Sequence, residues 1–216
     1  AEADCLHRRA IRTLRKRYFS SIYADVNSDG PVKNAKIAAG AVVLGEKLNP
    51  VWRGQRHVGI LLPPSIAGVS MNIAVLTAGK IPVNINYTAA TSIVQKICET
   101  AEIKTIVTSR VFMQQAKFKP PEGVEPGILE DMRKQITKLD QLRGAVLGRL
   151  MPLRWLEKYL GAERSPTIDD PAALIFSSGS TGIPKGVILT HWNVYSNCIA
   201  ARQTVGIDCN NARFLG

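Results

Sequence analysis

The stretch Leu174-Ile175-Phe176-Ser177-Ser178-Gly179-Ser180-Thr181-Gly182-Ile183-Pro184-Lys185-Gly186 joins an apolar strand to a turn that is rich in hydroxyl groups and glycine and ends in a lysine. Such glycines let backbone N–H groups approach a phosphate chain closely, the hydroxyls add donors, and Pro184 presents Lys185 as a point charge. We therefore predict a phosphate-binding loop for ATP. The residues expected to bind the phosphates are Ser177, Ser178, Gly179, Ser180, Thr181, Gly182 and Lys185.

A Walker A loop is the obvious alternative, but it needs a glycine directly before its lysine and a Ser or Thr directly after it. Here Pro184 precedes Lys185 and Gly186 follows it. A Gly/Ser-rich surface turn is the other alternative. The same residues match, position by position, the signature of the AMP-forming adenylating enzymes, the superfamily of acyl-CoA synthetases, luciferases and nonribosomal adenylation domains. Residues 187–191, Val-Ile-Leu-Thr-His, extend this resemblance.

Two further segments, Ile81 to Ala89 and Ala101 to Arg110, resemble the synthetase half of the bifunctional acyl-acyl carrier protein synthetase/2-acylglycerophosphoethanolamine acyltransferases. This resemblance implies an enzyme of fatty acid and phospholipid metabolism that uses ATP and Mg²⁺ to convert a fatty acid to an acyl-adenylate. The acyl group would then pass to the thiol of an acyl carrier protein, and an acyltransferase half usually precedes the synthetase.

Two other functions stay open, namely a ligase that uses CoA or activates another carboxylate, and a non-catalytic module that docks on a carrier protein or membrane. The family resemblance places the Mg²⁺ ligand and the catalytic lysine beyond Gly216, together with a C-terminal domain. No catalytic residue or metal ligand is therefore assigned within these 216 residues, and we expect this piece alone to be inactive.

Strand and helix patterns alternate along the chain, which predicts an α/β fold with a mostly parallel sheet flanked by helices, the N-terminal portion of the large domain of an adenylate-forming enzyme. The expected strands are 58–62, 81–85, 105–108, 128–129 and 172–176, and the expected helices are 35–48, 65–78, 88–101 and 191–205. We expect three parts of one partial AMP-binding domain: an α/β subdomain (1–130), a basic helical insertion (131–165) and the phosphate-loop strand with its helix (166–216).

Thr190 is expected to cap the helix that begins at His191, because a threonine hydroxyl can accept from the first free N–H groups of a helix. The positive end of that helix would add to the field around the phosphate loop. His191 itself is a candidate for the nucleotide site, although a histidine at a helix start is more often structural.

The chain carries 28 Lys and Arg against 17 Asp and Glu, and this net charge of +11 favours anionic partners such as ATP, an acidic carrier protein or lipid headgroups. Nucleic acid is not expected, because no zinc-finger spacing or RNP-like motif accompanies the charge. The four cysteines include no CxxC pair, so neither a metal site nor a disulfide scaffold is indicated. We expect a cytoplasmic protein that can contact the inner face of the cell membrane.

Two basic segments allow more than one interpretation. Residues 8–17 predict a helix whose arginines form a solvated face. Residues 142–160 are basic and amphipathic, with a break near Pro152. This second segment fits a helical flap packed on the domain, a helix on an anionic membrane surface, or a docking site for an acidic carrier protein.

Overall fold

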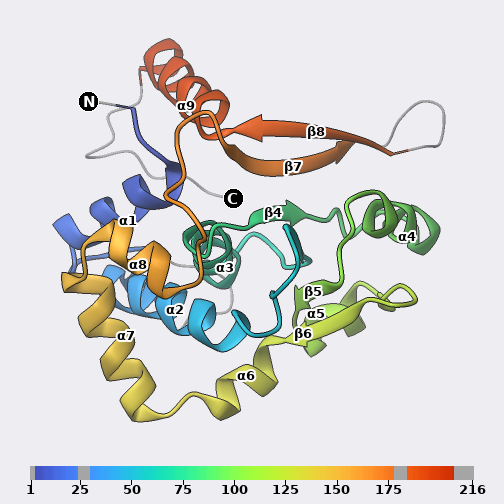
Figure 1. Ribbon diagram of the computed structural model, residues 1–216, viewed down its shortest axis with the longest axis horizontal. Helices are drawn as coiled ribbons and strands as arrows, with labels where there is room; N and C mark the ends of the chain where they lie inside the picture. The colour runs from blue at the N-terminus through green and yellow to red at the C-terminus, as the bar shows by residue number, and fades with distance from the viewer. Residues whose placement is uncertain (1–2, 24–29, 178–183, 207–216) are drawn as a thin grey trace.

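A four-stranded parallel sheet, in the order β4-β3-β5-β6, forms the centre of the fold (Figure 1). The computed structural model describes residues 3–23, 30–177 and 184–206. The strands in this part of the chain are β1 (Ser21–Tyr23), β2 (Val32–Lys33), β3 (His57–Ile60), β4 (Ile81–Asn84), β5 (Thr105–Thr108), β6 (Glu125–Ile128), β7 (Pro171–Ser177) and β8 (Lys185–Thr190). The helices are α1 (Leu6–Lys16), α2 (Asn34–Leu48), α3 (Ile66–Thr77), α4 (Thr91–Thr100), α5 (Arg110–Gln115), α6 (Leu129–Gln135), α7 (Lys138–Leu150), α8 (Leu153–Tyr159) and α9 (His191–Val205).

The central sheet separates two hydrophobic cores, because successive side chains of a strand point to opposite faces. Val58 and Ile60 of β3 belong to the core shared with α1, α2, α3 and α8. Ile106 of β5 belongs to the core shared with β4 and α4. Both faces of the sheet are therefore covered, which is the usual arrangement of parallel sheets. The predicted α/β class with a mostly parallel sheet is confirmed.

Local sequence signals placed several elements correctly. Ser65 caps α3 by accepting a hydrogen bond from the Gly68 N–H at 3.1 Å, and Gly79 follows that helix with a φ of +71°. Cys98 lies buried on α4, as a packed thiol does. The prediction for β6 was wrong in its bounds, since the strand ends at Ile128 and Leu129 begins α6. Pro126 concealed this strand, and proline is tolerated there because β6 is an edge strand.

The strand before the phosphate loop is not part of the parallel sheet. β7 pairs antiparallel with β8, from Pro171 opposite Thr190 to Ser177 opposite Lys185, and this hairpin packs beside β4 (Figure 1). β8 was not among the predicted strands. The apolar run at Val187 and Ile188 is typical of a buried strand. These two residues are nevertheless 49% and 61% exposed in the structure.

The basic helix α1 is less solvated than its sequence predicted. Arg8 is buried at 8% exposure, and Arg15 donates hydrogen bonds to the backbone oxygens of Gly148 and Met151 at 2.7 and 2.6 Å. The arginines therefore fasten α1 to the helices α7 and α8. α7 ends at Leu150 and α8 begins after Pro152, so the predicted break is confirmed, and α7 packs along α2 as a flap would.

Candidate functional site

The β7–β8 hairpin holds the described ends of the predicted phosphate loop. Ser177 and Lys185 are the paired residues at the end of the hairpin that carries the connecting loop, and we call this its open end. The Ser177 hydroxyl donates to the Lys185 backbone oxygen at 3.5 Å. Both side chains are exposed. Lys185 has no acidic side chain in ion-pairing distance within the described residues. An uncompensated cation beside a hydroxyl is what an anionic ligand requires.

The remaining predicted phosphate-binding residues, Ser178, Gly179, Ser180, Thr181 and Gly182, lie outside the described residues. They connect Ser177 to Lys185, whose pairing fixes where the segment leaves and re-enters the hairpin. The role of these five residues stays a prediction.

Packing below this open end holds the hairpin against the domain. Leu174 is buried in the core shared with β4 and α4, and Phe176 packs against the same core. A Cβ on Gly186 would lie 3.2 Å from Leu174 Cδ1 and from the Phe176 ring. Glycine at position 186 therefore lets the side chains of Leu174 and Phe176 pack against β8 directly next to Lys185.

The other end of the hairpin is fixed by Asp170. Arg164 pairs with this carboxylate, with one Nη1 to Oδ2 contact at 2.9 Å, and Thr167 donates to it from its N–H at 2.6 Å and its hydroxyl at 3.0 Å. Hydrogen bonding from Arg164 holds the pKa of Asp170 well below its usual value. The backbone N–H of Trp192 also donates to the backbone oxygen of Ile168 at 2.8 Å. These contacts tie the start of β7 to the start of α9.

His191 lies at this fixed end rather than at the open end. Thr190 caps α9 as predicted, accepting from the Asn193 N–H at 3.1 Å and donating from its own N–H to the Asn193 side chain at 3.0 Å. Lys185 and Thr190 are separated by the length of β8, roughly 16 Å at about 3.3 Å per residue. The positive end of α9 therefore lies away from Ser177 and Lys185, and its effect on the rest of the phosphate loop stays a prediction.

The imidazole of His191 is buried and engaged. Its Nδ1 accepts a hydrogen bond from the Leu6 N–H at 3.2 Å, and its ring centroid lies 5.6 Å from that of His7. Burial, followed by the influence of His7, lowers the pKa of His191 to about 4, so the ring is neutral near pH 7. The structure gives His191 a packing role between α1 and α9, and a contact with nucleotide stays a prediction.

A buried charged cluster, which sequence reasoning missed, joins α1 to α8. Arg8 donates to Glu157 through Nε at 2.6 Å and Nη2 at 2.8 Å, and His7 Nε2 contacts the same carboxylate at 2.8 Å. Ser165 adds a donor at 3.2 Å. Despite the cost of burial, the hydrogen bonds from His7 and Arg8 lower the pKa of Glu157 to about 2. Glu157 stood as an isolated acid in a basic segment, and that contrast was the only local signal.

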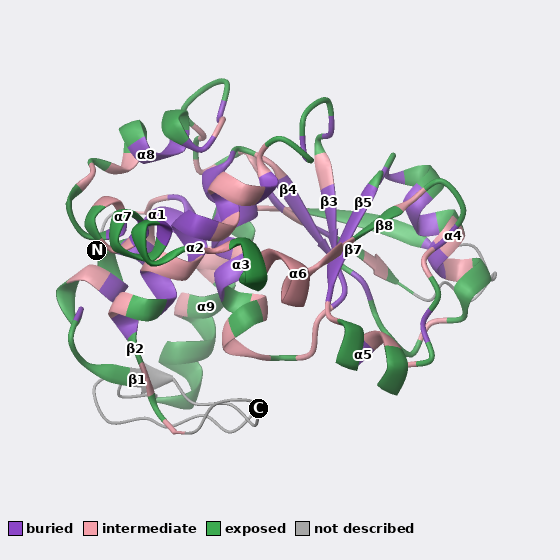
Figure 2. Ribbon diagram, turned by 90° about the horizontal axis from the view of Figure 1, so that it is seen from below, coloured by how far each residue is buried: buried purple, intermediate pink, exposed green. Residues whose placement is uncertain are grey.

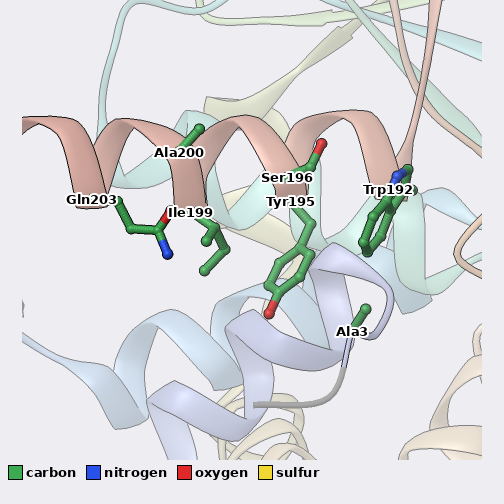
Figure 3. A pocket seen from close by; sticks show the side chains of 7 residues that line it. All are labelled: Ala3, Trp192, Tyr195, Ser196, Ile199, Ala200 and Gln203. Carbon is green, nitrogen blue, oxygen red and sulfur yellow. The ribbon is translucent and has the colours of Figure 1, made fainter.

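A shallow, mostly apolar pocket lies along α9 and holds none of the predicted phosphate-binding residues. Figure 3 shows Tyr195, Ile199 and Gln203 of α9 pointing toward α1, with Ala3 close by. Its other lining residues are Trp192, Tyr195, Ser196, Ile199, Ala200 and Gln203. The described part of the chain holds no group of three or more His, Cys, Asp or Glu side chains that could bind a metal ion. The open end of the hairpin is thus the candidate site.

The sequence also matches a known family. Residues 48–215, well over half of the chain, match the family model described as AMP-binding enzyme. The chain belongs to the AMP-binding enzyme family. The match includes the whole β7–β8 hairpin and the segment between its strands, so the candidate site lies within the matched residues.

Curated relatives of this AMP-binding domain include CoA ligases. The human mitochondrial medium-chain acyl-CoA ligase ACSF2 is 25% identical over 214 residues, which covers 90% of this chain and 34% of that ligase. The 4-coumarate–CoA ligase 2 of Oryza sativa subsp. japonica is 57% identical over 42 residues, which covers 19% of this chain and 7% of that ligase. The chain thus spans about a third of the length of ACSF2.

Solved structures share the fold of this AMP-binding domain. VinN superposes with a TM-score of 0.69 at 13% identity, covering 96% of this chain and 51% of VinN. A fatty acyl-adenylate ligase from L. pneumophila, in complex with acyl adenylate and pyrophosphate, gives 0.65 at 16% identity, covering 94% of this chain and 33% of the ligase. The fold is therefore that of adenylate-forming enzyme domains.

Proposed function

We propose that the protein carrying this sequence activates a fatty acid with ATP, forming an acyl-adenylate, and then transfers the acyl group to a thiol. The observation that carries the proposal is the exposed Lys185 beside Ser177, at the open end of a hairpin in an AMP-binding domain. ACSF2 and the L. pneumophila ligase are named for reactions of this class, which supports a fatty acid as substrate.

In the proposed reaction, a carboxylate oxygen of the fatty acid attacks the α-phosphorus of ATP. The new bond joins that oxygen to phosphorus, the bond to the bridging oxygen breaks, and pyrophosphate leaves with its electron pair. Lys185 would neutralise charge on the departing phosphates, and the Ser177 hydroxyl would donate to a phosphate oxygen. Such transfers depend chiefly on alignment and charge neutralisation, so these residues position the phosphates and do not act as nucleophiles.

ATP and Mg²⁺ are required by this proposal. The Ser177–Lys185 pair fits an anion, because it offers a hydroxyl donor and a cation with no acidic partner among the described residues. Residues 178–182 would contribute further N–H and hydroxyl donors to the β- and γ-phosphates. Mg²⁺ would neutralise phosphate charge, and we assign none of its ligands to the described residues.

The identity of the thiol is a finer point of the proposal. The resemblance of residues 81–89 and 101–110 to acyl-carrier-protein synthetases favours the thiol of a carrier protein. The relatives named as CoA ligases favour CoA as the second candidate. Both acceptors require the same adenylate, so they differ only in the second half-reaction.

Product analysis of the natural protein that carries this sequence tests the proposal. The protein would be incubated with ATP, Mg²⁺ and hexadecanoic acid, and then with CoA or an acyl carrier protein, and acyl-AMP and thioesters would be measured by mass spectrometry. We expect acyl-AMP without acceptor and its conversion to a thioester with the carrier protein. Thioester with CoA alone would assign the second candidate, and ATP hydrolysis to ADP without any acyl-AMP would overturn the proposal.

A further inference from the structure

The helix α7 presents two opposite faces. Its inner face is fixed by glycines: a Cβ on Gly144 would lie 2.5 Å from Val43 Cγ2 and 2.9 Å from the Ala39 oxygen, and one on Gly148 would lie 3.3 Å from the Ala38 backbone. Glycine at both positions lets α7 lie close against α2. The orientation of α7 around its own axis is therefore determined by this contact.

Four large aliphatic side chains form a ridge on the outer face of α7. Leu139, Leu142, Val146 and Leu150 are 71%, 63%, 47% and 71% exposed. At about 100° per residue these positions fall within about 80° of one another and roughly opposite the two glycines. Figure 1 shows α7 at the outer edge of the molecule, with α2 on its inner side, and Figure 2 shows α7 mostly in the colour of exposed residues. We call these four residues the α7 ridge.

Exposed cations lie on α7 beside the ridge and on α8, the next helix of the chain. Lys138 and Arg149 of α7, and Arg154 and Lys158 of α8, are exposed, and none of them has an acidic partner in the part of the chain that the structure describes. Arg149 also lies 4.8 Å from the centre of the Tyr18 ring. Exposed apolar side chains next to cations are the two contributions, apolar burial and attraction to anionic lipids, on which binding to a membrane surface depends.

A pocket rich in arginine adjoins the Leu150 end of the α7 ridge. Its cations are Arg8, Arg12, Arg15 and Arg154, of which Arg8 is paired with Glu157 and Asp4, and Arg12 is paired with Asp4. Burial, followed by the nearby Arg149 and Arg12, lowers the pKa of Arg15. Trp155, 71% exposed, lies on the wall of this pocket. Tryptophan is enriched at membrane interfaces, where its ring meets both apolar and polar surroundings.

We propose that the α7 ridge and Trp155 dock the protein on an anionic phospholipid surface, with the exposed cations Lys138, Arg154 and Lys158 on the lipid phosphates. The charge of these cations selects an anionic surface. The ridge stands outward on a helix and forms no groove, so it fits a lipid layer better than the helix of an acidic carrier protein. None of the helices in the described part of the chain is able to span a bilayer.

Binding to vesicles tests the proposal without any need for catalysis, so its failure is separate from failure of the proposed function. The natural protein would be mixed with phosphatidylcholine vesicles, with and without phosphatidylglycerol, and bound protein measured by flotation. We expect binding only with the anionic lipid, and about tenfold weaker binding for Leu142→Ser combined with Val146→Ser, since each side chain loses apolar burial. Removing charge with Lys138→Gln and Lys158→Gln should weaken binding to a similar degree.

Matched variants separate this surface from others. Ile188→Ser removes a side chain of similar size that is 61% exposed on β8, and Lys96→Gln with Lys104→Gln removes two exposed cations elsewhere. Both should bind as wild type does. Tryptophan fluorescence should shift to the blue on binding, and Trp155→Phe should remove this shift. Trp192→Phe, which replaces a tryptophan that is 46% exposed on α9, should leave the shift in place.

Several results would overturn the proposal. The first is the absence of vesicle binding, and the second is a loss of binding in the Ile188→Ser variant equal to that in the ridge variants. The third is binding that salt abolishes and that the ridge variants leave unchanged, because such binding would be attraction by net charge alone. Loss of binding to an acidic carrier protein in the ridge variants, in a protein that ignores vesicles, would assign the surface to that partner instead.

Discussion

Replacing Glu157 by glutamine should destabilise the protein by about 3 kcal/mol at pH 7, because it leaves the buried Arg8 with only the longer 3.4 Å contact to Asp4 as its counter-charge. Glu157 is 1% exposed and accepts hydrogen bonds from Arg8 at 2.6 and 2.8 Å and from His7 at 2.8 Å. Glutamine keeps the shape and one acceptor oxygen, which places the effect at the lower end of the range for broken buried ion pairs. The free energy of unfolding in urea would measure it, with circular dichroism as the signal.

The pH dependence of the same variant gives a second magnitude. The folded-state pKa of Glu157 is lowered to about 2 from 4.5. A carboxyl whose pKa is lowered by folding contributes stability that is complete above the unfolded-state pKa and is lost as the pH falls toward the folded-state value. Between pH 7 and pH 3.5 the wild type should lose about 1.4 kcal/mol of this contribution, and Glu157→Gln has no such carboxyl to lose. The difference between the two proteins should shrink accordingly.

Glu163→Gln is the matched control, because Glu163 is an exposed acid of the same segment. It should unfold as the wild type does. A loss below about 1 kcal/mol for Glu157→Gln at pH 7, or a difference from wild type that does not change between the two pH values, would refute the reasoning.

Three further predictions concern other contacts. Gly144→Ala should lower the free energy of unfolding in urea by about 1–2 kcal/mol although alanine favours helix, since its Cβ would meet Val43 and a backbone oxygen. Gly148→Ala should cost less, because the site has more room, and equal effects of the two substitutions would contradict the described packing of α7 on α2. Stability should fall as the pH drops from 6.5 toward 4 because His191 is buried neutral, and a His191→Gln variant should show a shallower slope between these values. Thr190→Ala should cost about 1 kcal/mol through loss of the α9 cap, and an unchanged unfolding midpoint would argue against the cap.

Local signals predicted those elements whose ends are set by neighbouring residues. Ser65 and Gly79 delimit α3, and Thr190 delimits α9, because capping needs only residues within one turn. β8 was not predicted. Its apolar residues do not alternate with polar ones, although the strand is exposed to solvent. β7 pairs antiparallel with β8 and also contacts β4, which is distant in the sequence, and no local pattern encodes that contact.

The sequence predicted which ligand the candidate site would suit, but not how the residues of the site are arranged in space. The residue types of the loop indicated phosphate binding, and the hairpin pairs Ser177 with Lys185 at its open end. His191 follows Lys185 closely in sequence, yet the extended β8 carries it to the opposite end of the hairpin. Arg8 and Glu157 are 149 residues apart, so their pairing had no signal beyond an isolated acid among basic residues.

Exchange of pyrophosphate into ATP, dependent on a fatty acid, measures the first half-reaction in the natural protein that carries this sequence. We expect exchange in the wild type, a loss of about 100-fold for Lys185→Ala, and no loss for Lys96→Ala, which removes an exposed lysine from α4. Exchange in the folded Lys185→Ala variant at the level of the wild type would contradict the assignment of the β7–β8 hairpin as the phosphate site. No exchange in the wild type with any carboxylic acid would contradict adenylation itself.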